Sequence, residues 1–222
     1  PSNPTGAVYS FNELKALSEV LLKYPNVLVL TDDIYEKIIY NREKFFTLAS
    51  VEPKMKERIL TLNGVSKAYC MTGWRIGYTA GDRDVIKAMG KLQGQSTSCP
   101  TSISQVAAIE ALTGDQSDVG SMREKFKKRR DYIVSRLNHM DSVNCATPGG
   151  AFYVFPDFSS HMDKGGNITC SKDLSMYFLE QKSVVTVSGE AFGGEGHVRF
   201  SYAASDEDLR RAMDFVEEAL NE

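Results

Sequence analysis

The sequence predicts an α/β domain followed by a smaller α+β domain. In the first half, short apolar runs that end in polar residues alternate with helical patterns, as in an open sheet covered by helices. A long charged amphipathic stretch, residues 117–139, then leads to a region in which short strand patterns are mixed with helical ones. We therefore expect a large domain over residues 1–120, an interdomain helix over 121–140 and a small domain over 141–222.

A helix opens the first domain, and a buried strand follows it. Ser10 and Glu13 form a capping box ahead of leucine and valine residues at helical spacing. The tripeptide Tyr24-Pro25-Asn26 ends this helix, and the apolar run Val27–Asp32 comes next. Such a continuous run predicts a strand that is buried on both faces, as in a parallel sheet.

Two further apolar runs, residues 59–62 and 75–80, predict strands of the same sheet. Asp32 closes the first strand, and Lys67 lies shortly after the second. Ligands of open α/β sheets bind at the carboxyl ends of the strands. We therefore expect Asp32 and Lys67 to lie at the same ligand-binding edge.

Two helices, residues 84–92 and 101–113, are predicted on either side of the loop Gln95–Pro100. After the long charged helix, the pattern changes to the short elements of an α+β layer. These elements are strands at 151–155, 184–187 and 198–202, and helices at 172–180 and 206–220.

The composition argues against several classes of protein. The net charge of −3, from 26 Lys and Arg against 29 Asp and Glu, gives no general attraction to nucleic acid or to an anionic membrane. No apolar run reaches the roughly 18 residues that a membrane helix needs. The cysteines are far apart and lack CxxC spacing, which indicates neither a metal site nor a disulfide framework and fits a reducing, cytoplasmic compartment: Cys70, Cys99, Cys145 and Cys170.

One basic run, Lys125–Arg130, resembles a polyanion-binding patch or a nuclear signal. Glu124 and Asp131 flank it within a helical pattern. We therefore interpret the run as the solvated face of a helix.

Lys67 carries the strongest chemical signal in the chain. A lysine at the end of an apolar strand can act as an amine nucleophile when it is desolvated beside other cations. Eight residues later, Arg75 offers a guanidinium fork that suits phosphate oxygens. A lone lysine is more often a surface residue, but an amine near a phosphate clamp indicates a phosphorylated aldehyde. Pyridoxal phosphate is the obvious candidate.

Other residues supply the polar groups that this cofactor requires. Asp32 can face the ring nitrogen and keep it protonated, while Tyr35 and Asn3 can hydrogen-bond the 3′-oxygen. Ser66 and Arg75 can hold the phosphate. Judged alone, Asp32 would be a loop or capping residue, Tyr35 a packing aromatic and Asn3 a turn residue. Their combination is what favours the cofactor site.

Asn3 and Arg199 are predicted to bind the substrate, and Lys67 is predicted to act on it. Arg199, in an apolar strand of the second domain, is suited to bind an α-carboxylate through two hydrogen bonds, although a surface role is as plausible for it alone. Lys67, once displaced by the substrate amine, is placed to move the proton between the substrate Cα and the cofactor C4′.

The ordered motifs resemble those of class I pyridoxal-phosphate aminotransferases over the whole chain. The resemblance is greatest to the bacterial and plastid type of aspartate aminotransferase, some members of which also use prephenate. It depends on Asn3-Pro4-Thr5-Gly6, Asp32-Asp33-Ile34-Tyr35, Ser66-Lys67, Met71–Tyr78 and Val198–Tyr202.

The resemblance implies fold type I: part of a large α/β/α domain that binds pyridoxal 5′-phosphate, then a small mobile domain, in a homodimer. It implies an exchange of amino groups between an amino acid, aspartate or glutamate, and a 2-oxo acid. It places the loop Ser96-Thr97-Ser98 at the partner's active site and Gly150–Tyr153 near the substrate. The family pattern begins upstream of Pro1, so we expect a longer protein whose earlier part completes the site.

Two other functions are compatible with these residues. The same scaffold supports C–S lyases and amino-acid synthases, and it also occurs as the sensor domain of transcription regulators. Arg199 and the segment Gly150-Ala151-Phe152 suit turnover of an amino acid, which favours a transaminase.

Overall fold

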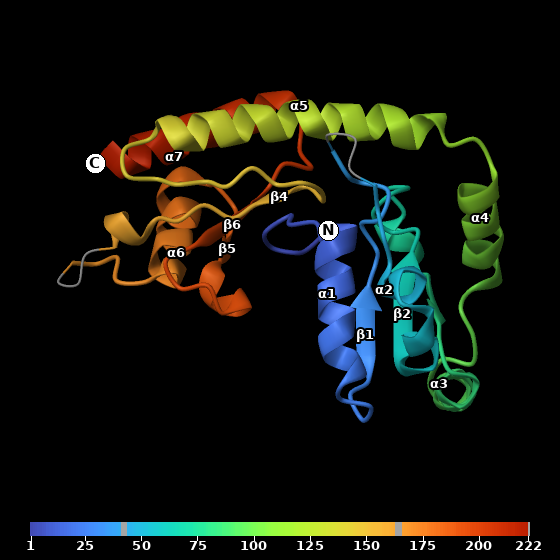
Figure 1. Cartoon of the computed structure of the whole chain (residues 1–222). Coiled ribbons are helices and arrows are strands. Elements are labelled where there is room, and N and C mark those ends of the chain that lie inside the picture. The colour runs from blue at the N-terminus through green and yellow to red at the C-terminus, as the bar shows by residue number, and fades with distance from the viewer. Residues whose placement is uncertain (41–43, 163–165, 222) are drawn as a thin grey trace. The chain divides into compact units, whose positions relative to one another are not determined.

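The computed structural model describes residues 1–40, 44–162 and 166–221 of the chain (Figure 1). These residues form two compact units, which we describe one at a time. Unit 1 comprises Pro1 and Val8–Ser121, and unit 2 comprises Ser2–Ala7 and Met122–Glu222. The three-part division expected from the sequence stays a prediction.

Unit 1 contains the three-stranded sheet that the apolar runs predicted (Figure 1). Its strands are β1 (Val29–Asp32), β2 (Ile59–Gly64) and β3 (Gly77–Ala80), in the order β1-β2-β3. β1 pairs with β2 in parallel, with Asp32 opposite Leu62, whereas β3 is antiparallel to β2. Because β1 and β2 are parallel, both of their carboxyl ends lie at one edge of the sheet.

The helices of unit 1 bury one small apolar core beside this sheet. Helix α1 (Phe11–Leu22) begins with the predicted capping box: Glu13 N donates to Ser10 Oγ over 3.3 Å, and Ser10 N donates to Glu13 Oε2 over 2.8 Å. A short helix, α2 (Leu48–Val51), packs against α1. Their shared core consists of Leu14, Leu48, Val51, Met55 and Ile59.

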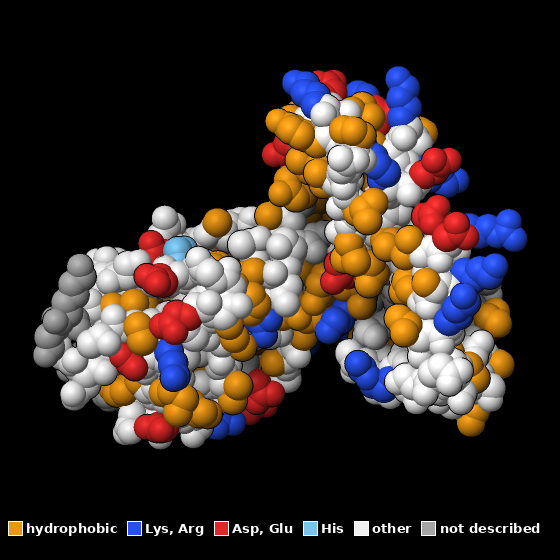
Figure 2. All heavy atoms as spheres, turned by 90° about the horizontal axis from the view of Figure 1, so that it is seen from below, with side chains coloured by type: hydrophobic (Ala, Val, Ile, Leu, Met, Phe, Trp, Pro, Cys, Tyr) orange, Lys and Arg blue, Asp and Glu red, His pale blue; other side chains and the backbone are white. Residues whose placement is uncertain are grey.

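The prediction that the first strand is buried on both faces is wrong for the described residues. Val29 packs towards the core of unit 1, but Leu28 and Leu30 are 73% and 65% exposed. A strand is buried on both faces only when a layer of helices covers each face of its sheet. The described helices cover only one face of β1. Hydrophobic side chains are also visible at the surface drawn in Figure 2.

Helix α3 (Arg83–Ser96) is longer than the sequence predicted. Asp82 caps its start, because Oδ1 accepts from Asp84 N over 2.9 Å and from Val85 N over 3.1 Å. The helix continues through Gly94, and Thr97 N donates to Gln93 O over 2.9 Å at its end. Glycine weakens a helix without ending it, so the expected loop is shorter and precedes α4 (Ser102–Thr113).

Unit 2 is an α+β layer, as the sequence predicted (Figure 1). Its antiparallel sheet has the strand order β4-β6-β5. The core includes aromatic rings in mutual contact: Phe158, Phe178 and Phe200. The elements are α5 (Ser117–His139, which starts in unit 1), β4 (Tyr153–Val154), α6 (Ser171–Lys182), β5 (Val187–Ser188), β6 (Val198–Ser201) and α7 (Asp206–Asn221).

All three strands of unit 2 are shorter than predicted, and beside β4 and β5 neighbouring residues leave the extended conformation. Ala151 has φ +57°, so the strand that follows begins only at Tyr153. Ser183, at the end of α6, has φ +55°, and Val184 N donates to Phe178 O over 2.9 Å. Val184 therefore belongs to the end of the helix rather than to β5. Among the described residues, no helix has the length and apolarity that crossing a membrane requires.

Cys145 provides a test of the core of unit 2. Its side chain is buried, and burial raises the pKa of its thiol to about 12. Since the thiolate is the reactive form, we expect iodoacetamide at pH 8 to leave Cys145 unmodified in the native protein. Peptide mass mapping should detect the adduct only after unfolding in guanidinium. Rapid modification of Cys145 in the native protein would show that this core is open.

Candidate active site

The carboxyl edge of β1 and β2 gathers three of the predicted site residues. Asp32 ends β1 with an exposed side chain, and its Oδ1 accepts from Ile34 N over 3.4 Å at the start of a turn. That turn carries Tyr35, which is buried. The Nζ atom of Lys67 lies 6.0 Å from the centroid of the Tyr35 ring. An amine, a phenol and a carboxylate therefore share this edge.

Lys67 lies in a tight turn whose neighbours are buried. Tyr69 N donates to Val65 O over 3.3 Å, and Met71 N donates to Ser66 O over 3.1 Å. Val65 and Ala68 are almost fully buried, whereas Lys67 is half-buried. The buried neighbours fix the backbone of the turn, so the amine is accessible but held by a rigid support.

Gln116 fastens this turn to the loop that precedes α5, a contact that the sequence did not indicate. Its Oε1 accepts from Tyr69 Oη over 2.8 Å and from Lys37 Nζ over 3.5 Å. Its Nε2 donates to Ala111 O over 3.0 Å and to Gly114 O over 2.9 Å. The segment after Lys67 is thus tied to a loop that lies more than forty residues away.

Arg75 and Ser66 are the two residues expected to hold a phosphate. Arg75 has φ +50° and follows a short 3₁₀-helix, Thr72–Trp74, so β3 begins two residues later than predicted. Its Nη1 donates to Thr72 O over 2.8 Å, and the side chain is otherwise exposed. Ser66 is buried at the start of the Lys67 turn. A guanidinium and a hydroxyl are groups that bind phosphate oxygens.

The two adjacent aspartates differ in their surroundings. Asp33 is buried, and burial raises the pKa of its carboxyl above the ordinary value. Asp32 is exposed at the edge of the sheet. A carboxylate that must stay charged opposite a cationic ring is better supplied by Asp32 than by its buried neighbour.

Unit 2 contains a cluster of its own around Arg199. This residue lies in β6, and its Nη1 donates to Asn3 Oδ1 over 2.8 Å. The guanidinium carbon lies 4.5 Å from the centroid of the Tyr153 ring and 5.1 Å from that of Phe192. Its Nε is buried and has no hydrogen-bond acceptor among the described residues. A buried, unsatisfied donor of this kind indicates the place of an anionic ligand such as a carboxylate.

The contact with Arg199 also orients the amide of Asn3. A guanidinium can only donate, so the atom that faces it is the amide oxygen. The Nδ2 of Asn3 therefore remains a donor for an oxyanion. The two residues are 196 positions apart in the chain, and the structure brings them together.

Two aromatic residues of this cluster were not predicted as contacts of Arg199 from the sequence, Tyr153 and Phe192. Tyr153 belongs to the segment expected near the substrate, and its ring is a platform for Arg199. Phe192 lies after β5 in a stretch without a recognisable motif. Ser96 is the last residue of α3 rather than a loop residue; it is exposed, as are Thr97 and Ser98, and the expected position of this segment at a partner's site stays a prediction.

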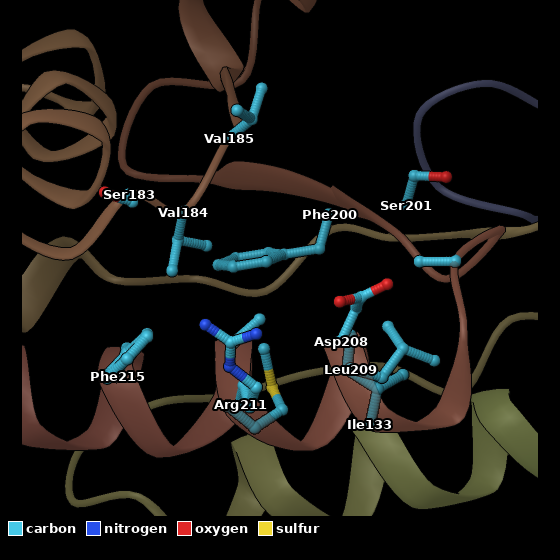
Figure 3. Close-up of a pocket in the computed structure, with 13 residues that line it drawn as sticks. Ile133, Ser183, Val184, Val185, Phe200, Ser201, Asp208, Leu209, Arg211 and Phe215 are labelled. Carbon is cyan, nitrogen blue, oxygen red and sulfur yellow. The ribbon is translucent and has the colours of Figure 1, made fainter.

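Unit 2 also has a hollow with a volume of about 340 Å³, which is separate from the residues around Arg199 described above (Figure 3). None of the site residues predicted from the sequence lines it. Arg211 and Asp208 of α7 point towards Phe200 there.

Comparison with known proteins gives consistent matches along the chain. A family model described as aminotransferase class I and II matches residues 1–216. The chain is 50% identical over 216 residues to the aspartate/prephenate aminotransferase of Cereibacter sphaeroides, covering 96% of this chain and 54% of that protein. It is 47% identical over 225 residues to the aspartate aminotransferase of Rhizobium meliloti, covering 100% of this chain and 55% of that protein.

Solved structures give the same result. The crystal structure of the Rhizobium meliloti aspartate aminotransferase matches with a TM-score of 0.94 and 46% identity, covering 100% of this chain and 56% of that one. The aromatic aminotransferase of Pyrococcus horikoshii matches with a TM-score of 0.91 and 37% identity, covering 100% and 58%. The chain spans about half the length of the curated relatives that it matches.

Proposed function

Because this chain belongs to the class I and II aminotransferases and has their fold type I architecture, we propose that the protein is a pyridoxal-phosphate-dependent transaminase. Its substrates would be aspartate or glutamate and a 2-oxo acid. Relatives that are about 50% identical are named aspartate/prephenate and aspartate aminotransferases. The observation that carries the proposal is the position of Lys67 beside Tyr35 at the edge where Asp32 ends its strand.

The residues of unit 1 fit this cofactor chemically. When bound, pyridoxal phosphate supplies an electron sink for the bond that breaks at the substrate Cα. Asp32 supplies the exposed carboxylate for the ring nitrogen, and Tyr35 supplies a phenol for the 3′-oxygen. Ser66 and Arg75 supply a hydroxyl and a guanidinium for the phosphate.

Lys67 and Arg199 would have different roles, the first in proton transfer and the second in substrate binding. The amine of Lys67 would hold the cofactor aldehyde, and as a free amine it would move a proton at the substrate Cα. The guanidinium of Arg199 binds the substrate α-carboxylate, which satisfies its buried Nε. The Asn3 amide nitrogen, left as a donor by the contact with Arg199, would be available to the cofactor 3′-oxygen.

The wider assignments also belong to this proposal. We expect a homodimer in which Ser96–Ser98 of one subunit approach the active site of the other. We expect the protein to act in the cytoplasm on small amino acids and 2-oxo acids. These expectations come from the family resemblance rather than from a contact within the described residues.

The half-reaction with glutamate tests the proposal. Glutamate added to the protein that is produced from its complete coding sequence and saturated with pyridoxal phosphate should abolish the visible absorption band of the bound cofactor. One equivalent of 2-oxoglutarate should be released, without ammonia. Release of ammonia with the oxo acid would instead identify a lyase. No spectral change with any amino acid would contradict the proposed function.

A further inference from the structure

Arg130 is a buried arginine within the basic run of α5. We interpreted the whole run as a solvated face, but the Arg130 side chain is only 4% exposed. Its Nε and Nη2 donate to Asp131 Oδ1 over 2.9 and 2.6 Å, and its Nη1 donates to Pro148 O over 3.0 Å. Burying a cation is costly unless its donors are used. Part of this guanidinium is used to hold a loop carbonyl.

The loop that contains Pro148 and Gly150 packs directly against the turn that contains Asn3. Gly6 has φ +66°, and a Cβ atom placed on it would lie 2.5 Å from Pro148 Cβ and 2.7 Å from Gly150 O. Gly150 N donates to Gly6 O over 2.9 Å. Only glycine permits both this backbone conformation and this close approach. The position of Pro148 therefore sets the position of Gly6.

The position of Asn3 depends in turn on that of Gly6, because both lie in one hydrogen-bonded turn. Gly6 N donates to Ser2 O over 2.8 Å, and Ser2 N donates to Ala7 O over 2.9 Å. These two hydrogen bonds close the turn around Asn3, whose Oδ1 accepts from Arg199. All of these residues belong to unit 2.

The other end of the loop is fixed to the chain that follows the strand carrying Arg199. Tyr202 Oη donates to Ala151 O over 3.1 Å, and Tyr202 N donates to Phe152 O over 3.0 Å. Tyr202 is fully buried. The loop is thus braced by Arg130 at Pro148 and by Tyr202 at Ala151, so loss of either brace should displace it.

From this chain of contacts we propose that Arg130 is a positioning residue for the substrate α-carboxylate. It acts through Pro148, Gly6 and Asn3 to hold the Arg199 guanidinium in its binding orientation. This inference rests on the proposed function, in which Arg199 binds that carboxylate. Arg130 itself touches neither cofactor nor substrate in this assignment.

The test uses the variant Arg130→Met in the cofactor-loaded protein made from its complete coding sequence. Methionine leaves the buried Pro148 carbonyl without this donor, and such losses displace the group concerned. Because the amino acid and the oxo acid share an α-carboxylate, we expect KM for both to rise about tenfold, equal to about 1.4 kcal/mol. We expect kcat to change less than about twofold. The dissociation constant of succinate, measured by calorimetry, should rise by the same factor as KM.

Three further variants separate positioning from general destabilisation. Arg123→Met replaces an exposed arginine of the same helix and should leave succinate binding unchanged. Arg130→Lys keeps the charge but lacks the fork, so it should weaken binding only about threefold. In an Asn3→Ala background, Arg130→Met should add little, because coupled residues do not contribute additively.

The outcomes are distinguishable. A lower melting temperature of Arg130→Met with unchanged succinate binding would overturn the positioning role. If Arg130→Met does not fold, unchanged binding in Arg130→Lys would overturn it instead. If Arg199→Ala leaves succinate binding unaltered, the proposed carboxylate site is wrong. If only Asn3→Ala leaves it unaltered, the positioning path through Asn3 fails. If Asn3→Ala weakens binding and Arg130→Met does not, only the present inference fails.

Discussion

Replacement of Lys67 by alanine is expected to lower kcat for transamination by at least about 10⁴-fold. The proposed mechanism gives two tasks to this one amine, the attachment of the cofactor aldehyde and the transfer of a proton at the substrate Cα. Alanine removes both, and the neighbouring phenol of Tyr35 is buried and cannot replace an amine nucleophile. An assay with aspartate and 2-oxoglutarate measures the loss.

The attachment point has its own measurement. Borohydride reduction of the cofactor-loaded wild-type protein should leave a covalent label on the peptide that contains Lys67, and the variant should give none there. Lys87→Ala, at an exposed position of α3, is the matched control and should keep both label and activity. A label on another lysine of the wild-type protein would show that Lys67 was assigned the wrong role.

The position of Lys67 follows from local sequence signals, which explains why it could be predicted. Each apolar run is a strand because its residues are compatible with a pleated, buried surface. Parallel pairing of β1 and β2 then places Asp32 and the turn of Lys67 at one edge. The remaining step, the approach of Lys67 to Tyr35, requires only the turns that directly follow the two strands.

Other features depend on contacts between distant segments, which periodicity does not encode. The burial of Arg130 inside a basic run depends in part on the distant Pro148 carbonyl, to which its Nη1 donates. The role of Gln116 depends on Tyr69 in another part of unit 1. Leu30 is exposed because the described helices do not cover its face of the sheet. The apolar run in the sequence indicates only that such a residue can be buried.

The pairing of Asn3 with Arg199 leads to the second large effect that we expect. Arg199→Ala should lower kcat/KM for both the amino acid and the oxo acid by about 10²- to 10³-fold, because it removes the guanidinium that is proposed to pair with the carboxylate of both substrates. Arg199→Lys should recover part of the loss, since it keeps the charge but lacks the planar fork. Steady-state kinetics with both substrates measures each effect.

The aromatic environment of Arg199 sharpens this expectation. Tyr153 and Phe192 flank the guanidinium, so its plane is restricted and little rotamer freedom is lost when a carboxylate binds. Arg210→Ala, at an exposed position of α7, is the matched control and should leave kcat/KM unaltered. A loss confined to one of the two substrates would contradict the assignment, because the α-carboxylate is the group that the amino acid and the oxo acid have in common.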